Sequence, residues 1–273
     1  MTPPRLFVVP AAGSAHAMIL RRGPARQVAA LGWNRDTDEV TLGQWLKGRI
    51  YEFRCDLSPD GRHFVYFAGT GDPDHPSGGW WTAVSRAPYL HALHFFPKSD
   101  TWSGGGAFTP DGECWLNGST GAWEASSEIR FCTDPAAFPH STDGFWMGEL
   151  YATRMELRGW ARTGTGYDVV LRKPLADGWA LRWWVETGQK NRALVAGRYA
   201  LEHSAGAGID LPDWEWADLW QGELQVAEKG QLKAVALENG RLRDTRLIRD
   251  FGDMEFEAIA APYDTRSTRE RSR

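Results

Sequence analysis

Nine charged residues stand among apolar neighbours in four short stretches of the chain, and their types suit either ligand binding or bond cleavage. The set is Glu52, Arg54, Asp56, Arg154, Glu156, Arg158, Glu215, Glu255 and Glu257. Two carboxylates that face each other across a cleft, such as Asp56 with Glu156 or Glu215, are the groups with which a glycosidase protonates and attacks a sugar bond. Arginines beside such carboxylates lower the pKa of the acid and oppose proton donation. We therefore expect ligand binding or ion pairing here and assign no catalytic residue.

Alternation along these stretches indicates which side chains point the same way. In residues 51–57 the apolar side chains occupy one parity and the charged ones the other, and residues 151–160, 214–220 and 254–260 alternate similarly. On a strand, the side chains at every second position face the same way. Here the apolar set would pack against neighbouring sheets, and the charged set would lie near the charged sets of the other three stretches. Residues 103–107, which have almost no side chains, would supply a smooth wall. The pattern predicts a channel lined by mixed charges, and binding of a small polar ligand in it is one interpretation, though not the favoured one. The alternative is a water-filled channel whose charges neutralise one another.

Two groups of residues invite a metal assignment, and both fall short. His91 and His94 lie three positions apart, which places them on opposite faces of a strand. The loop at 71–76 holds two aspartates and a histidine but lacks the longer acidic ladder of a calcium loop. The Ser-Gly-Gly-Gly run at 103–106 lacks the Lys-Ser/Thr that follows a phosphate-binding loop. We predict no metal site and no cofactor.

A repeated turn indicates the elements that would position these residues. Ser58-Pro59-Asp60-Gly61 recurs as Thr109-Pro110-Asp111-Gly112, 51 positions later (109 − 58), with strand-like runs on both sides each time. Proline presets φ at the first corner, aspartate caps the turn, and glycine accepts the positive φ. The two motifs predict tight hairpins.

These turns resemble the Ser-Pro-Asp-Gly turns of bacterial propeller repeats, those of TolB-like and WD-repeat-like proteins. The resemblance implies a β-propeller in which the turn joins neighbouring strands of one blade. It is specific at the two turns and extends over about a third of the chain, so it concerns architecture and not a particular member.

The rhythm of strands and turns continues through the chain. Further runs occur at 80–85, 89–96, 151–160, 167–172, 179–186, 214–220, 223–227, 231–237 and 245–248, with Asp177-Gly178, Lys229-Gly230 and Asn239-Gly240 as turns. Residues 254–260 have the pattern of an innermost strand, and residues 6–9, 17–20 and 26–31 have that of a blade lacking one. We expect them to pair as a composite blade that closes an all-β, five-bladed β-propeller and removes free sheet edges. A six-bladed ring, with a blade inside residues 119–148, is the alternative.

Composition limits the class of partner. The 273 residues carry a net charge of −4, which offers no basic field for nucleic acid. No apolar run approaches the ~20 residues that span a bilayer, and the N-terminus lacks the pattern of a secretion signal. The three cysteines suit buried free thiols in a reducing compartment. We expect a cytoplasmic protein with one propeller domain over residues 1–263 and a disordered basic tail at 264–273, with no nucleic acid or membrane partner.

Three functional hypotheses remain at this point. The first is a non-enzymatic interaction module or scaffold that binds a protein partner through its faces. The second is a propeller that binds, or hydrolyses as a glycosidase would, a small polar ligand at the channel. The third is a carbohydrate-binding lectin, suggested by the pairs Trp80-Trp81 and Trp183-Trp184, in each of which one ring must face opposite to the other.

Overall fold

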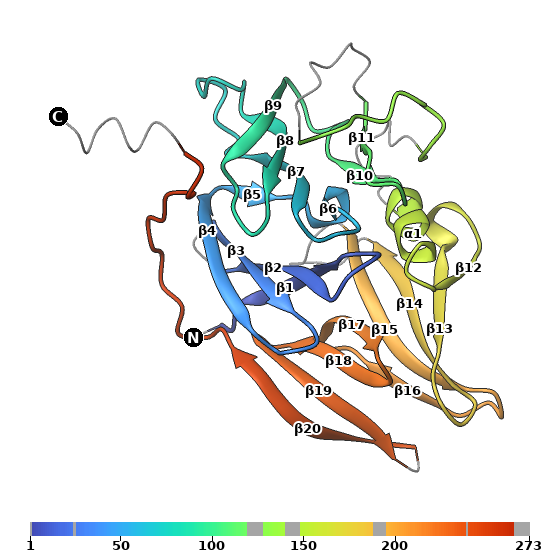
Figure 1. The fold of residues 1–273 in the computed structure, drawn as a ribbon. Coiled ribbons are helices and arrows are strands. Elements are labelled where there is room, and N and C mark those ends of the chain that lie inside the picture. Colours follow the sequence, from blue (N-terminus) through green and yellow to red (C-terminus); the bar gives the residue numbers. More distant parts are fainter. Residues whose placement is uncertain are drawn as a thin grey trace.

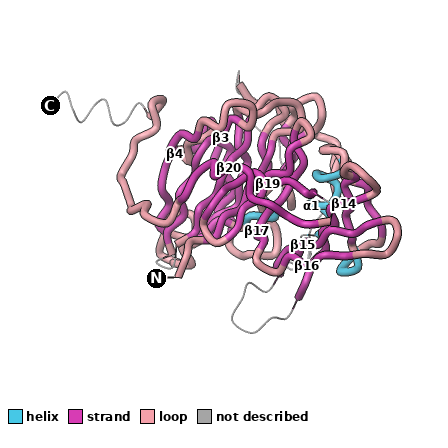
Figure 2. The backbone as a smooth tube through the Cα atoms, turned by 90° about the horizontal axis from the view of Figure 1, so that it is seen from below, coloured by secondary structure: helices cyan, strands magenta, loops and turns pink. Residues whose placement is uncertain are grey.

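Five antiparallel sheets follow one another along the chain (Figures 1 and 2). The computed structural model describes residues 2–23, 26–118, 128–139, 148–187, 195–238 and 240–264. Four of the sheets have four or five strands, and the third has two strands among these residues. The chain is therefore an all-β propeller, and we number its sheets 1 to 5 in chain order.

Each sheet is built from consecutive strands. Sheet 1 contains β1 (Arg5–Pro10), β2 (His16–Arg22), β3 (Gln27–Asn34) and β4 (Val40–Lys47). Sheet 2 contains β5 (Arg49–Ile50), β6 (Asp56–Leu57), β7 (His63–Gly69), β8 (Trp80–Arg86) and β9 (Ala92–Lys98), and sheet 3 contains β10 (Gly106–Phe108) and β11 (Cys114–Leu116). Sheet 4 contains β12 (Ala161–Thr163), β13 (Val170–Pro174), β14 (Trp179–Thr187), β15 (Val195–His203) and β16 (Gly208–Leu211). Sheet 5 contains β17 (Trp214–Trp220), β18 (Glu223–Glu228), β19 (Gln231–Glu238) and β20 (Arg241–Asp250).

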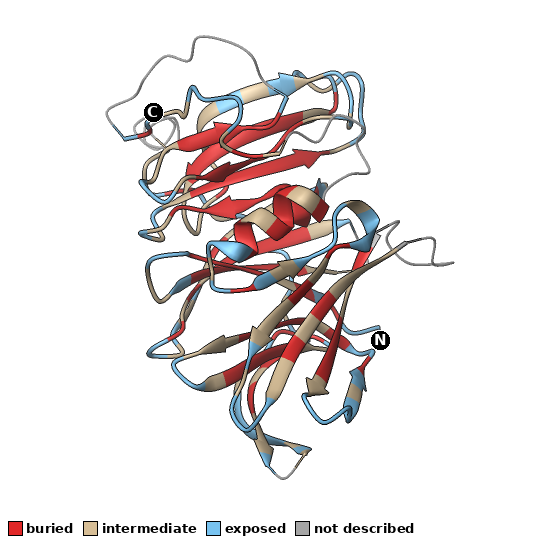
Figure 3. Cartoon of the chain, turned by 90° about the vertical axis from the view of Figure 1, so that its right-hand side faces the viewer, coloured by how far each residue is buried: buried red, intermediate tan, exposed pale blue. Residues whose placement is uncertain are grey.

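Buried side chains join each sheet to the next. Sheets 1 and 2 share one apolar cluster, sheets 2 and 3 another, and sheet 3 packs on the helix α1 (Gly148–Glu156). A large cluster then joins α1 to sheets 4 and 5, and a last one joins sheet 5 back to sheet 1. Buried segments accordingly run through the middle of the strands, while the turns at their ends are exposed (Figure 3). The sheets form a ring held by side-chain packing between blades.

The hairpin turns expected from the sequence are confirmed. The amide of Gly61 donates to Ser58 O at 2.8 Å, and the amide of Gly112 donates to Thr109 O at 2.9 Å. Both glycines have the positive φ that the turn requires, +77° and +82°. The dipeptides Asp177-Gly178 and Lys229-Gly230 likewise stand between β13 and β14 and between β18 and β19. Asn239 lies outside the described residues.

The expected inner strand at 151–160 is wrong, because this segment begins as the helix α1. Its buried residues include Leu150, Tyr151, Arg154 and Met155, which recur at the spacing of three to four that one helix face requires. Leu, Ala, Met, Arg and Glu are good helix formers, whereas strands favour β-branched residues. A short run of alternating apolar and charged residues satisfies both periods, and the packing of Tyr151 and Met155 against sheets 4 and 5 favours the helix.

The expected strand at 51–57 is also wrong. A 3-10 turn, η1 (Glu52–Arg54), separates the short strands β5 and β6. All residues from 52 to 57 are buried, so the two parities do not separate an inner from an outer face. The turn is stabilised by packing, since Phe53 sits between the rings of Phe7 and Tyr151, with centroids 5.3 and 5.1 Å away.

The composite closing blade is wrong as well. Strands at 6–9, 17–20 and 26–31 are confirmed as β1 to β3, but β4 completes their sheet, and residues 254–260 form no strand. This segment leaves β20 and follows the outside of β4 (Figure 1), where Phe256 packs on Trp45 at 5.9 Å and Gln44 Nε2 donates to Ile259 O at 2.8 Å. Residues 254–260 thus form a strap along the sheet edge, and their alternation does not separate a buried from an exposed face, because Phe256 is 38% exposed and Ala258 is exposed as well. The six-blade alternative concerns 119–148, of which 119–127 and 140–147 lie outside the described residues.

Candidate functional site: a buried charged centre

Asp56 is an expected site residue at which several elements meet. It lies in β6, is 1% exposed, and accepts from Arg158 Nη2 at 2.8 Å, with Arg154 Nε at 3.1 Å. Its other oxygen accepts from the amide of Phe108 in β10 at 2.8 Å. One carboxylate therefore joins sheet 2, sheet 3 and the segment of α1.

The helix explains why two arginines reach the same carboxylate. Arg154 and Arg158 are four positions apart, which places them on one face of a helical turn. Arg158 also donates to Arg154 O at 2.7 Å, closing the end of the helix, and to Pro10 O of β1 at 2.8 Å. Burial lowers the pKa of Arg158, and the nearby Asp56 opposes that shift. The arrangement ties α1 to sheets 1 and 2.

A second buried group lies beside the first, and none of its residues was singled out from the sequence. Arg35, just after β3, has Nη1 3.1 Å from Asp218 Oδ2 of β17, and Lys173 of β13 donates to the other oxygen of Asp218 at 2.6 Å. Arg35 Nε donates to Gln225 Oε1 of β18 at 2.8 Å. Burial lowers the pKa of Arg35, Asp218 opposes this, and the positive charge of Arg158 adds to the lowering. This group joins sheets 1, 4 and 5.

Three indole rings surround Arg35. Its guanidinium carbon lies 5.7, 5.6 and 4.6 Å from the ring centres of Trp33, Trp216 and Trp220. A guanidinium over an aromatic face is attracted by the ring quadrupole, and more strongly when water is excluded. The rings thus hold the cation where sheets 1 and 5 meet.

The arrangement at the centre is suited to holding blades together. Each carboxylate is buried and contacts two cations, Asp56 with Arg154 and Arg158, and Asp218 with Arg35 and Lys173. Buried ion pairs add little net stability, because desolvation offsets attraction, but removal of one partner leaves a buried charge that costs about 3–5 kcal/mol. These buried ion pairs therefore favour the one arrangement of blades in which every buried charge has its partner.

Two more of the nine expected site residues make contacts that link neighbouring sheets. Glu52 of η1 is paired with Arg22 of β2, which links sheets 2 and 1. Glu215 of β17 accepts from the amide of Leu6 in β1 at 2.6 Å, which links sheets 5 and 1. Both carboxylates therefore pair across the junction between two blades.

The remaining expected residues do not join the centre. Arg54 is buried, but its Nη1 donates to Thr101 O and Ser103 O at 2.7 and 3.0 Å. Glu156 is 43% exposed and pairs with Arg162 at 3.9 Å, and Glu255 and Glu257 are exposed on the strap. Of the nine residues, the structure brings Asp56, Arg154 and Arg158 together and places the other six elsewhere.

The glycine run at 103–106 has a packing role. A side chain at Gly105 would collide with Arg54 O, and one at Gly104 would collide with the ring of Phe67. The run therefore lets sheet 3 approach sheet 2 closely, and it forms no smooth wall.

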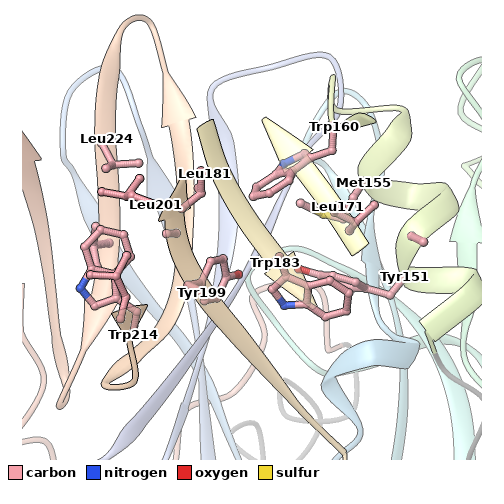
Figure 4. Close-up of a cluster of buried hydrophobic side chains, with 14 of the residues drawn as sticks. Tyr151, Met155, Trp160, Leu171, Leu181, Trp183, Tyr199, Leu201, Trp214 and Leu224 are labelled. Carbon is pink, nitrogen blue, oxygen red and sulfur yellow. The ribbon is translucent and has the colours of Figure 1, made fainter. Parts of the chain in front are cut away.

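Tryptophan placement follows the expected alternation. Trp81 and Trp183 are buried, 6% and 2% exposed, whereas Trp80 and Trp184 are half-buried. Trp183 lies in the cluster that joins α1 to sheets 4 and 5, where Figure 4 shows it facing Tyr151 of α1 with Tyr199 close by. The buried ring of each pair serves packing between layers, so only its neighbour offers a surface.

Two concavities lie away from the centre. The junction pocket, of about 660 Å³, is lined by His16, Gly61, Arg62, His63, Arg86, Ala87 and Glu128 where sheets 1 and 2 meet. The tryptophan groove, of about 740 Å³, lies between sheets 4 and 5; its lining includes Trp179, His203, Leu224, Leu237 and Arg246. Both volumes fall within the range of ligand sites.

Within the described ranges, no His, Cys, Asp and Glu side chains gather in threes as a metal site requires, and no helix has the length and apolar character to cross a bilayer. Cys55 and Cys114 are buried free thiols, as expected, and Cys132 is half-buried.

Comparison with known proteins finds no family for the chain and two distant structural similarities. No known family matches the chain, and no curated protein matches it. Among solved structures it is similar to the GH43 BlXynB protein from Bacillus licheniformis, with TM-score 0.33 and 10% identity over 96% of this chain, and it spans 60% of that one. It is also similar to the beta-propeller domain of the Trilobed protease from Pyrococcus furiosus, with TM-score 0.27 and 7% identity over 89% of this chain and 84% of that one. These are distant resemblances to β-propellers, at the level of the fold.

Proposed function

We propose that this chain is a non-enzymatic interaction module, a rigid propeller ring that binds a partner protein through its loop-bearing faces. The observation that carries the proposal is the pairing of Asp56 and Asp218, each with two cations, in the buried centre. Carboxylates held this way link blades, and they do not face a cleft as the acid and base of a hydrolase must. The residues that bind the partner protein would then lie on the loop-bearing faces of the propeller.

The charge distribution supports a protein partner, and we propose a cytoplasmic setting for it. A net charge of −4 gives no general attraction to nucleic acid or to anionic lipid. The ion pairs between sheets 1, 2, 4 and 5 keep the loops in fixed relative positions, and a preorganised surface binds at a lower entropic cost. We further propose that β10 and β11 represent a fifth blade, so that the ring has five.

Single charge reversals on the two faces and on the outer edge test the proposal. Arg62 is 77% exposed at the β6–β7 turn, Asp74 is exposed in the β7–β8 loop at the opposite end of the blade, and Arg243 is 71% exposed on the edge strand β20. A partner is captured from the source cells, purified, and titrated against Arg62→Glu, Asp74→Lys and Arg243→Glu. We expect one face variant to weaken binding about tenfold or more and the edge variant to bind as wild type. Equal binding by all three would contradict recognition through the faces.

A second candidate, carbohydrate binding, is favoured by the tryptophan groove. Trp179 lines it beside His203, with ring centres 5.0 Å apart. Glu223 and Arg246 also line it, and Arg246 Nη1 and Nη2 donate to the two carboxylate oxygens of Glu223 at 2.7 and 2.8 Å. An aromatic platform beside fixed polar groups suits a sugar ring. Oligosaccharide titration followed by tryptophan fluorescence tests this. Trp179→Ala should abolish the response and Trp184→Ala, at a half-buried tryptophan that does not line the groove, should retain it. A response that survives Trp179→Ala would exclude this site.

A further inference from the structure

We propose that the buried centre binds one small monovalent inorganic anion, of the size and charge of chloride, beside Arg35. This inference goes beyond the proposed function, because it concerns the interior of the ring and not its faces. It starts from the charges of the two ion-paired groups in the centre. These groups contain two carboxylates and four cations, which are Asp56 and Asp218, and Arg35, Lys173, Arg154 and Arg158. Positive charges therefore outnumber negative charges by two inside the ring.

This excess of positive charge is withdrawn from water. The side chains of Arg35 and Arg158 are 2% and 5% exposed, and a buried charge is costly unless an opposite charge lies close to it. A further carboxylate that acts on Arg35 belongs to Asp36, but this residue is exposed, so water and salt screen its charge. Asp36 also accepts from Trp220 Nε1 and Gln221 Nε2, at 2.7 and 2.9 Å. The excess thus remains for a ligand to offset.

The two groups repel each other through Arg35 and Arg158. Burial is the main cause that lowers the pKa of Arg35, Asp218 opposes it, and the positive charge of Arg158 lowers that pKa further. All three side-chain nitrogens of Arg158 donate to protein oxygens. Arg35 donates through Nε and is paired through Nη1, but its Nη2 has no acceptor among the residues that the structure describes. Arg35 Nη2 is therefore the donor at which an anion would bind.

Two indole N–H groups next to Arg35 also lack an acceptor in the described part of the chain. They belong to Trp33 and Trp216, which are 1% and 0% exposed and whose rings lie against the guanidinium group and against each other. An indole nitrogen can only donate, and a buried donor without an acceptor is costly. A water molecule would bring two more hydrogens and no charge, whereas a halide ion accepts from several N–H groups and offsets one positive charge. The donors and the excess charge together select an anion.

Anion binding would be coupled to the stability of the ring. A ligand that binds the folded chain and not the unfolded chain raises the melting temperature as its concentration increases. Salt also screens the ion pairs on the surface, so the ionic strength has to stay constant during the titration. Sodium chloride is therefore exchanged for sodium gluconate, whose anion is too large for a site between a buried guanidinium group and indole rings.

Three variants each remove one element of the site. Arg35→Gln removes the cation together with the donor Nη2. Lys173→Gln removes one of the excess charges and leaves Asp218 to Arg35 alone, and Trp216→Phe removes an N–H group but keeps an aromatic ring. Lys173→Gln and Trp216→Phe keep the test valid if Arg35→Gln does not fold.

Two further variants are matched controls away from the centre. Trp45→Phe removes another indole N–H group that has no acceptor within the described ranges, but this ring packs on Phe256 of the strap and on Arg21. Arg243→Gln removes a cation that is 71% exposed on the edge strand β20. Both changes should leave the anion site intact.

The melting temperature of each full-length variant is measured by tryptophan fluorescence over a series of chloride concentrations, with bromide as a second probe. We expect wild type, Trp45→Phe and Arg243→Gln to gain stability as either halide replaces gluconate. Lys173→Gln and Trp216→Phe should need about tenfold more chloride for the same gain, the change expected for one lost charged interaction. Arg35→Gln should show no gain. Crystals grown in bromide should show an anomalous scattering peak beside Arg35 Nη2.

The inference is overturned if the melting temperature of wild type is the same in chloride and in gluconate, or if Arg35→Gln gains as much from chloride as wild type does. Bromide peaks confined to surface residues would also overturn it, because they would show an adventitious ion only.

Discussion

Arg35 Nη1 lies 3.1 Å from Asp218 Oδ2, and the two side chains, 2% and 3% exposed, join the first blade of the ring to the last. No strand pairing between the two sheets appears among the described residues, so this ion pair, the indole rings around it and the apolar cluster of sheets 1 and 5 hold that seam.

The first prediction concerns this pair. Arg35→Ala leaves Asp218 with Lys173 alone and empties the space between three indoles, so we expect a loss of about 3–5 kcal/mol in the free energy of unfolding. Arg243→Ala, on the exposed edge strand, is the control and should change it by less than about 0.5 kcal/mol. Urea denaturation measures both. Equal stability of the two variants would show that the seam does not depend on Arg35.

The second prediction concerns Asp56. Asp56→Asn keeps the shape of the side chain but removes the negative charge that Arg154 and Arg158 share. We expect a loss of about 3–5 kcal/mol. Asp244→Asn, at a 66% exposed carboxylate paired with Lys233, should cost less than about 1 kcal/mol. If Asp56→Asn melts at the wild-type temperature, the buried centre does not order the blades.

The third prediction uses two adjacent tryptophans. Trp183 is 2% exposed in the cluster of α1 and sheets 4 and 5, and Trp184 is half-buried with the Arg182 guanidinium 4.6 Å from its ring centre. Trp183→Ala should lower the free energy of unfolding by about 3–5 kcal/mol, because it leaves a large cavity. Trp184→Ala should lower it by about 1 kcal/mol or less. The reverse order in thermal melts would contradict the assignment of faces on β14.

The fourth prediction is a pH dependence at the first turn. Burial alone would raise the pKa of Asp60, but hydrogen bonds from Ser58 and from Arg62 lower it to about 2. A carboxylate whose folded-state pKa is depressed stabilises the fold above its unfolded value of about 3.9 and loses that contribution as the pH falls towards 2. The melting temperature of Asp60→Asn should therefore be below that of wild type at pH 5 and approach it near pH 2.

Asp111→Asn, at the equivalent residue of the second turn, is the comparison for this experiment. In the first turn, Ser58 Oγ donates to Asp60 Oδ1 at 2.6 Å. In the second turn, Thr109 stands in the place of Ser58, and its Oγ1 accepts from the amide of Glu113 at 3.0 Å. A gap between Asp60→Asn and wild type that stays constant from pH 5 to pH 2 would refute the pKa assignment.

The fifth prediction separates the strap from the blades. Truncation after Asp253 removes the packing of Phe256 and the hydrogen bonds of Tyr263 to Arg86 and His91, 3.2 and 2.7 Å. Because β1 to β4 complete sheet 1 without it, we expect a cooperative melt with stability reduced by about 1–3 kcal/mol. Deletion of residues 1–34 removes β1 to β3 and should abolish folding. Complete unfolding of the C-terminal truncation would instead support a composite blade.

Turn chemistry is what the sequence by itself determined. Pro-Asp-Gly and the Asp-Gly and Lys-Gly dipeptides place hairpins through local φ preferences, so these hairpins and most strands of sheets 2 and 5 followed without knowledge of the fold. The strands β4 of sheet 1 and β12, β15 and β16 of sheet 4 were not predicted. The alternation of Trp183 and Trp184 is local in the same sense, because successive side chains of a strand face opposite ways.

Tertiary structure decided everything that depends on two distant segments. Residues 151–158 satisfy a strand and a helix period alike, and they became helix where Tyr151 and Met155 could fill the space beside sheet 4. Residues 254–260 alternate like a strand, but the edge they would have joined is completed by β4.

The buried centre shows the same limit most clearly. Arg35, Lys173, Asp218 and Gln225 come from three sheets and share no spacing in the chain, so no periodicity could join them. A buried charge is tolerated only when folding brings a partner to it, and which partner arrives is a property of how the blades pack.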